Sequence, residues 1–248
     1  MRSARLSVSA LLVGAVLIAV PACAQRTSTP TRSASAQRVL IVGGGTSHDY
    51  SRWFDAADAA TLAGSGAQVR YTEDTGSILP ALAETDVLYL SNNQPLPDPA
   101  LRDAIVRHVE SGRGLIIGHA ASWYNWNDWP AYNRDLVGGG TRAHARYGEF
   151  TVDVVQPDHP IMHGVPSSFN VTDELYRFLP DSAGPVTTVL ATAKEQATGK
   201  VYPIVWTVQH RDGRIVVNTL GHDGAAHTHP AYQTILQNSL RWTARQVR

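Results

Sequence analysis

The feature that most constrains this chain is a regular alternation between short apolar runs and segments with helical periodicity. The apolar runs lie at 38–43, 68–72, 86–91 and 114–118, and the helical segments between them lie at 51–64, 78–83 and 98–111. Parallel strands that are buried on both faces have continuous apolar sequences, and helices supply the crossovers that such strands need. The sequence therefore predicts an α/β domain with a mostly parallel sheet.

The rest of the chain has a weaker pattern. The segment from about 121 to 200 contains an aromatic stretch and one alternating strand at 149–155, and it is otherwise rich in turns. Further elements are predicted near the C-terminus: strands at 203–208 and 215–220, joined by a tight Asp212-Gly213 turn, and a closing helix at 230–245. Because no internal repeat or second boundary interrupts this pattern, we expect residues 38–248 to form a single domain.

The first 24 residues have the pattern of a signal peptide. Arg2 and Arg5 precede the uncharged stretch LSVSALLVGAVLIAV, which is too short for a membrane span of about 20 residues and is typical of a secretory apolar region. Two cleavage sites fit. Ala22-Cys23-Ala24 would release a soluble protein that begins at Gln25, whereas residues 20–23 resemble a lipobox, with cleavage before a lipidated Cys23. We therefore expect export, either to the periplasm or to a lipid anchor on the cell envelope.

Composition limits the partners of the domain. Residues 25–37 are rich in Ser and Thr and are expected to form a flexible linker. From residue 38 onward the chain has 17 Lys and Arg against 21 Asp and Glu, which argues against nucleic acid because phosphate binding needs a basic surface. Cys23 is the only cysteine of the chain, so the domain contains neither a disulfide nor a cysteine nucleophile. A small molecule is the expected partner, the membrane is reached only through the N-terminal anchor, and the oligomeric state is left open.

Polar residues follow the predicted parallel strands at the edge where α/β domains bind ligands. They are Ser47, His48 and Asp49 after the first strand, Asn92, Asn93 and Gln94 after the third, His119 after the fourth, and His222 and Asp223 after the last. Because parallel strands end on one side of the sheet, we expect His119 and His222 to share a pocket with His48 and Asn92 near its rim.

Three sequence blocks resemble the ThuA family of trehalose-utilisation proteins. They are Gly114-Leu115…Gly118-His119-Ala120-Ala121, His159-Pro160-Ile161…Thr172-Asp173-Glu174-Leu175-Tyr176, and Thr219-Leu220-Gly221-His222-Asp223…Asn238-Ser239-Leu240-Arg241-Trp242. The resemblance runs from about Arg38 to the C-terminus. It implies a flavodoxin-like, three-layer domain similar to class I glutamine amidotransferases, and a connection with bacterial sugar catabolism.

The comparison with amidotransferases also excludes their reaction. That superfamily has a catalytic cysteine on the turn after a strand and a His-Pro-Glu sequence near the C-terminal strand. Here His119 occupies the position of the cysteine, and His222 is followed by Asp223. Without a thiol no thioester can form, so the chain is not a glutaminase. The two imidazoles remain as acids, bases or metal ligands.

The candidate site residues fall into two groups. His119, His222, Asp223 and His48 are the catalytic candidates, and His119 and His222 are also candidate ligands for a divalent metal such as zinc. Substrate binding is assigned to the side chains of Asn92, Gln94, Trp123, Tyr124, Asp173 and Glu174. Structural roles are the alternative: a histidine can bond a loop carbonyl, Asp223 can cap a helix, and the aromatic residues can pack as a lid.

Three functions are compatible with these residues. The first is an exported enzyme that acts on a disaccharide, a glycoside or its keto derivative through a histidine-lined pocket. The second is a non-catalytic sugar-binding or interaction module on a degenerate amidotransferase-like scaffold. The third is a metal-dependent hydrolase in which the same histidines are ligands. The geometry of the site separates them, because a metal site needs at least three side chains that converge on one point.

Overall fold

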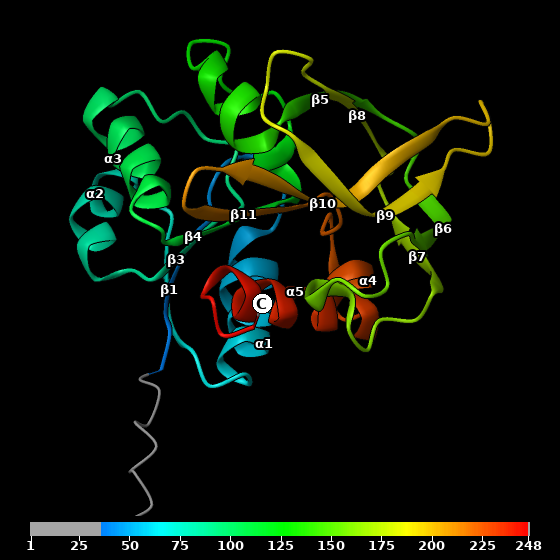
Figure 1. The fold of residues 1–248 in the computed structure, drawn as a ribbon, viewed down its shortest axis with the longest axis horizontal. Coiled ribbons are helices and arrows are strands. Elements are labelled where there is room, and N and C mark those ends of the chain that lie inside the picture. Colours follow the sequence, from blue (N-terminus) through cyan, green and yellow to red (C-terminus); the bar gives the residue numbers. More distant parts are fainter. Residues whose placement is uncertain (1–35, 248) are drawn as a thin grey trace, which may run out of the picture. The chain divides into compact units, whose positions relative to one another are not determined.

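The computed structural model describes residues 36–247, and Figure 1 shows their arrangement around one large sheet. Within these residues the sheet has nine strands in the order β2-β1-β3-β4-β11-β10-β9-β6-β7. Its first half is parallel and consists of β2 (Gln68–Thr72), β1 (Arg38–Val42), β3 (Val87–Leu90), β4 (Gly114–Gly118) and β11 (Gly213–Asn218). The predicted α/β domain is thus confirmed.

Helices cover both faces of the parallel strands (Figure 1). The helices are α1 (Ala59–Ala63), which continues the helical segment Ser51–Asp58, α2 (Ile78–Ala81), α3 (Pro99–Glu110), α4 (Gly224–His227) and α5 (Pro230–Thr243). Helices α1 and α5 pack on one face, and α2 and α3 on the other. Alternate residues of β1 explain why both faces are covered, since Val39 and Ile41 belong to one apolar cluster and Leu40 and Val42 to the other.

The second half of the sheet is antiparallel and lies mainly in the segment that the sequence predicted to be rich in turns. It consists of β10 (Val201–His210), β9 (Thr187–Lys194), β6 (Gly148–Val154) and β7 (Ser168–Asp173). A separate two-stranded sheet pairs β5 (Gly139–His144) with β8 (Tyr176–Pro180). The expectation of a mostly parallel sheet therefore holds only for the core. Antiparallel strands with one exposed face lack continuous apolar runs, which is why most of these strands were not predicted.

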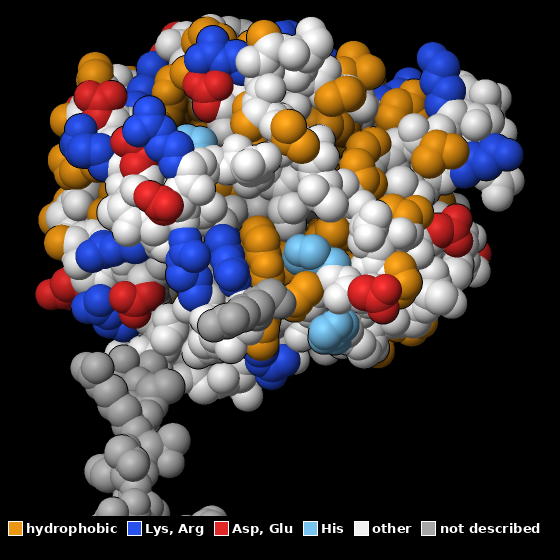
Figure 2. Space-filling model, in the orientation of Figure 1, with side chains coloured by type: hydrophobic (Ala, Val, Ile, Leu, Met, Phe, Trp, Pro, Cys, Tyr) orange, Lys and Arg blue, Asp and Glu red, His pale blue; other side chains and the backbone are white. Residues whose placement is uncertain are grey.

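The surface charge and the helix lengths can be compared with the expectations about nucleic acid and membrane as partners. Figure 2 shows basic and acidic side chains interspersed over the visible face, without a continuous basic region. None of the helices within residues 36–247 combines the length and the apolar character needed to cross a membrane. The predicted signal peptide and most of the predicted linker lie outside the described residues.

Candidate functional site

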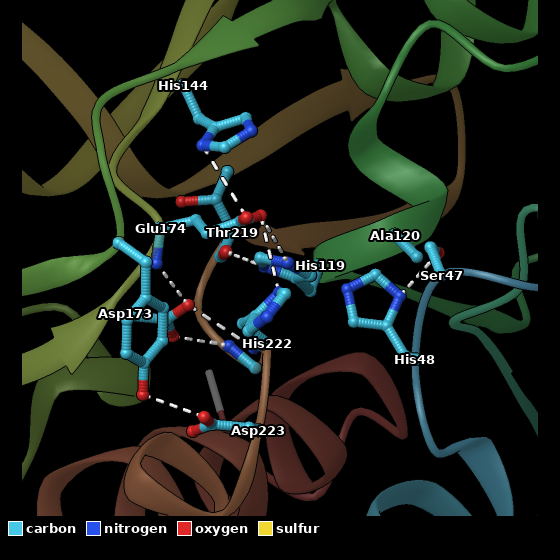
Figure 3. A network of polar contacts seen from close by, with 12 residues as sticks. Ser47, His48, His119, Ala120, His144, Asp173, Glu174, Thr219, His222 and Asp223 are labelled. Atoms are coloured by element: carbon cyan, nitrogen blue, oxygen red, sulfur yellow. Dashed lines mark hydrogen bonds and ion pairs between the residues drawn. The ribbon is translucent and has the colours of Figure 1, made fainter.

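Four side chains from distant parts of the chain converge at the carboxyl edge of the parallel strands (Figure 3). His48 lies in the loop after β1, His119 directly follows β4, and His222 lies in the loop after β11. Glu174 lies between β7 and β8, so the antiparallel half of the fold supplies the carboxylate. One nitrogen or oxygen atom from each of these residues lies within 4.8 Å of the others.

His119 presents a free nitrogen to this cluster. Its side chain is fully buried, and its Nδ1 lies 2.5 Å from the carbonyl oxygen of Thr219. Because a carbonyl only accepts hydrogen bonds, Nδ1 must carry the proton. The Nε2 atom of a neutral His119 therefore has a lone pair, and it lies 3.6 Å from Oε2 of Glu174.

His222 shares the same carboxylate oxygen. Its Nδ1 lies 3.3 Å from Oε2 of Glu174, and this contact with a negative charge raises the pKa of His222. Burial works to raise the pKa of Glu174, but the contacts with His119 and His222 outweigh burial and lower that pKa. Glu174 is therefore ionised at neutral pH and lies between two imidazoles.

His48 completes the cluster as a neutral ring. Its ring centre lies 4.9 Å from that of His119 and 5.0 Å from that of His222. Burial, followed by repulsion from those two titratable rings, lowers the pKa of His48 to about 3. Its Nδ1 lies 2.6 Å from Oγ of Ser47, which also accepts a hydrogen bond from Asn93. The Nε2 atom of His48 thus remains free.

Within residues 36–247, three ring nitrogens of this cluster are buried and make no hydrogen bond of normal geometry, although two of them lie 3.3 and 3.6 Å from Oε2 of Glu174. They are Nε2 of His48, Nε2 of His119 and Nδ1 of His222. Buried polar atoms normally have hydrogen-bond partners. Several buried nitrogens without one, gathered at one point, therefore indicate a site for a ligand that bonds to them. Three imidazoles and one carboxylate form a donor set suited to zinc. In a tetrahedral zinc site, neighbouring donor atoms lie about 3.3–3.6 Å apart, and the two contacts of Glu174, at 3.3 and 3.6 Å, already fit this spacing.

The cluster forms one wall of a cavity of about 340 Å³. This volume is at the lower end of the usual range for small-molecule sites. The lining residues are Ser47, His48, Asn93, Ala120, Trp123, Asn125, His144, Glu174, Tyr176 and His222. Of the residues predicted from sequence, His48, His222, Glu174 and Trp123 line the cavity, and His119 joins them through its contacts with Glu174, His48 and Tyr176.

Asp173 lies behind the cavity and connects two loops of the site. Its carboxylate is fully buried and accepts hydrogen bonds from the backbone N–H groups of Glu174, Gly221 and His222. Burial raises the pKa of Asp173. The sequence predicted a substrate-binding side chain here, and the structure places it as a link between Glu174 and His222 (Figure 3).

Four other candidates lie outside the lining. Asn92 is fully buried, and its side-chain amide has no hydrogen-bond partner within residues 36–247. Gln94 donates to the carbonyls of Gly43 and Glu73. Tyr124 lies under the guanidinium of Arg142. Asp223 caps α4 through the N–H of Ala225 and accepts a hydrogen bond from Tyr147.

Two lining residues were missed by the sequence analysis. Asn125 donates to the carbonyl of Ala120, and only its position two residues after Trp123 hinted at a role. His144 lies 3.5 Å from Oε1 of Glu174, on the opposite side of the carboxylate from His119 and His222. It belongs to β5, a strand without a sequence signal of its own, so nothing in the sequence connected it with the site.

Comparisons with known proteins agree with this fold. Two ThuA-like proteins of known structure resemble the chain. The protein from Parabacteroides merdae has 21% sequence identity and a TM-score of 0.76, and the match covers 85% of this chain and 91% of that protein. The protein from Bacteroides uniformis has 23% identity and a TM-score of 0.72, and the match covers 87% of this chain and 95% of that protein. At these identities the similarity concerns the fold. No curated protein matches the chain. The family model for ThuA, described as trehalose utilisation, matches residues 38–243, and the chain therefore belongs to the ThuA family.

Proposed function

We propose that this chain is a metal-dependent enzyme that acts on a neutral sugar outside the cytoplasm. The observation that carries the proposal is the convergence on the carboxylate of Glu174 of three buried ring nitrogens that make no hydrogen bond of normal geometry within the described residues. An isolated cluster of this kind would leave lone pairs unsatisfied in a poorly solvated site. A divalent cation satisfies them, and zinc fits the donor set of His48, His119, His222 and Glu174.

The hydrogen bonds behind the cluster favour ligand roles for the histidines. The carbonyl of Thr219 holds the proton of His119 on Nδ1, so Nε2 is the available donor. Such outer contacts fix the tautomer and orientation of metal-binding histidines. Oγ of Ser47 lies 2.6 Å from Nδ1 of His48, and this contact orients the ring so that Nε2 faces the cluster. A bound metal would polarise a substrate oxygen or activate a water molecule.

Other residues of the cavity lining supply groups that suit a sugar. Trp123 presents an aromatic ring, and the side-chain oxygen of Asn125 makes no hydrogen bond within the described residues, so it is available to a hydroxyl group. The lining residues include no Lys or Arg. The cavity therefore favours an uncharged sugar, or its keto derivative, over a sugar phosphate, and the trehalose-utilisation description of the family agrees with a carbohydrate substrate.

The scaffold is proposed to be the flavodoxin-like one shared with class I glutamine amidotransferases. The parallel strands have the order β2-β1-β3-β4-β11, which corresponds to the 2-1-3-4-5 order of flavodoxin-like sheets. His119 takes the place of the nucleophile at the end of β4. The signal-peptide pattern of residues 1–24 supports export, to the periplasm or to a lipid anchor at Cys23.

Metal analysis combined with an activity screen tests this function. We expect the purified chain to retain about one zinc equivalent, and to deplete members of a panel of trehalose, other disaccharides and their 3-keto forms, as followed by mass spectrometry. The His119→Ala variant should lose both metal and activity. The matched control is His163→Ala, because His163 is exposed and the hydrogen bond of its ring, to the carbonyl of Asp158, lies outside the cavity lining.

The same experiment separates the alternatives. Activity that is lost on chelation and restored by zinc supports the proposal. Activity that is indifferent to chelation would assign acid–base roles to the histidines instead. A chain that binds sugar without any turnover would be a binding module.

A further inference from the structure

A buried ion pair that the proposed chemistry does not use lies next to the loop that carries His222. Asp58, at the end of the helical segment Ser51–Asp58, and His227, at the end of α4, are both fully inaccessible to solvent. Oδ1 of Asp58 lies 2.7 Å from Nδ1 of His227. Its Oδ2 accepts hydrogen bonds of 2.8 and 2.9 Å from the hydroxyl groups of Tyr89 and Tyr232.

The second nitrogen of His227 reaches the loop that carries His222. Nε2 of His227 lies 3.1 Å from the carbonyl oxygen of Gly221. Because both neighbours of the ring are acceptors, both nitrogens carry protons and His227 is a cation. Burial works to lower the pKa of His227, but the carboxylate of Asp58 and the carbonyl of Gly221 together raise it.

Gly221 is consequently held on both sides. Its carbonyl is bound by His227, and its N–H donates to Oδ2 of Asp173 at 2.7 Å. The next residue is His222, and Asp173 directly precedes Glu174. A continuous chain of contacts thus runs from Asp58 through His227, Gly221 and Asp173 to the neighbouring residues His222 and Glu174 of the proposed metal site.

Stability alone is a weak reason for such a pair. Removing two charges from water costs free energy, and apolar residues of similar volume often stabilise a fold as well or better. The tyrosine hydroxyl groups donate hydrogen bonds to Asp58. The charged ring of His227 donates its second hydrogen bond to Gly221, which lies outside the pair. The Gly221 contact satisfies the second N–H of the ring, and at the same time it joins the pair to the loop that carries His222.

We propose that Asp58 and His227 are positioning residues that fix the backbone at Gly221, so that Nδ1 of His222 and Oε2 of Glu174 are held together before the metal binds. This inference rests on the proposed metal site. The positioning acts through backbone contacts, and neither residue touches the metal or the substrate.

Two substitutions of His227 separate positioning from a general structural role. The amide nitrogen of Gln can occupy the place of Nε2, whereas that of Asn can occupy only the place of Nδ1. His227→Gln therefore keeps a donor for Gly221, His227→Asn loses it, and both remove the charge. Zinc affinity, measured by competition with a chromophoric chelator, should fall at least about tenfold in His227→Asn and stay close to wild type in His227→Gln. Equal zinc affinities in the two variants would overturn the inference.

Hydrogen exchange of the full-length protein supplies a second test that does not need zinc binding. In the wild-type chain, amides in a peptide covering residues 219–223 should be protected equally with and without zinc, because the loop is already held. Protection that arises only on zinc addition would overturn the inference. If the wild-type chain binds no zinc, the proposed function fails, and loss of protection in His227→Asn but not in His227→Gln still decides whether the pair fixes the loop.

Discussion

At the scale of single residues, two histidines a short distance apart have opposite electrostatic environments. His48 is surrounded by other imidazoles, and burial together with repulsion from those titratable rings lowers its pKa to about 3. His227 faces a carboxylate and a carbonyl, and these contacts raise its pKa despite burial. The first ring is therefore neutral and suited to bind a cation, whereas the second is itself a cation. The difference comes from the partners and not from the depth of burial.

The raised pKa of His227 predicts how its contribution to stability depends on pH. A group whose pKa is higher in the folded state stabilises the fold fully below its unfolded pKa of about 6.5, and loses that contribution as the pH rises through the folded value. The groups that face the ring are Asp58, the carbonyl of Gly221 and the hydroxyl of Tyr232, and Asp173 adds a more distant negative charge.

We therefore expect the unfolding free energies of wild type and His227→Gln to differ most near pH 6 and to converge toward pH 9. Urea denaturation of metal-free protein at several pH values measures this difference. Titration of His48 and His222 occurs in both chains and largely cancels. Parallel curves from pH 6 to pH 9 would contradict a charged His227.

The sequence predicted part of this site at residue level. His48, His119 and His222 each follow an apolar strand, and the rule that parallel strands end on one side brought them together correctly. Glu174 was named only through the family resemblance and with a substrate-binding role. His144 and Asn125 could not be predicted, because their proximity depends on strands and loops without a distinctive pattern.

At the scale of elements, the loop between β11 and α4 depends on the backbone conformation of one glycine. Gly221 has a φ of +127°, a conformation that side chains other than glycine rarely adopt. A Cβ atom at this position would lie 3.4 Å from Cβ of His119, from Nε2 of His227 and from the hydroxyl of Tyr232. These are ordinary van der Waals distances, so it is the backbone angle that requires glycine here.

Gly221→Ala should weaken both the fold and the metal site. We expect a loss of about 1–3 kcal/mol of unfolding free energy from backbone strain, together with reduced zinc content because His222 moves with the loop. Gly66→Ala is the matched control, since Gly66 also has a positive φ of +86° but no atoms within 4 Å of the added Cβ. The control should lose stability while keeping its zinc, and equal zinc contents in the two variants would contradict a constrained loop.

The predictability of the elements followed their burial. Strands β1, β3 and β4 are covered on both faces and were predicted from continuous apolar runs. Strand β7 alternates buried and exposed residues over the sequence SFNVTD, and its polar positions are also typical of turns. Its pairing with β6 depends on contacts that form only in the folded chain, so this pattern alone did not predict it.

At the scale of the whole molecule, the first described strand and the family match begin at the same residue. Strand β1 starts at Arg38, and the family match starts at residue 38. Cleavage before Cys23 or after Ala24 would therefore leave every described strand and helix intact. The two proposed cleavage sites differ in the first residue of the mature chain and in whether that residue carries a lipid.

We expect the mature protein from the envelope fraction to begin at a lipid-modified Cys23, as identified by mass spectrometry of its N-terminal peptide. Cys23→Ser should prevent the modification and leave the unfolding temperature unchanged, because the described domain begins well after this position. A mature N-terminus at Gln25 without lipid would contradict the anchor but not export. An intact Met1 in the cytoplasmic fraction would contradict both, and with them the proposed site of action outside the cytoplasm.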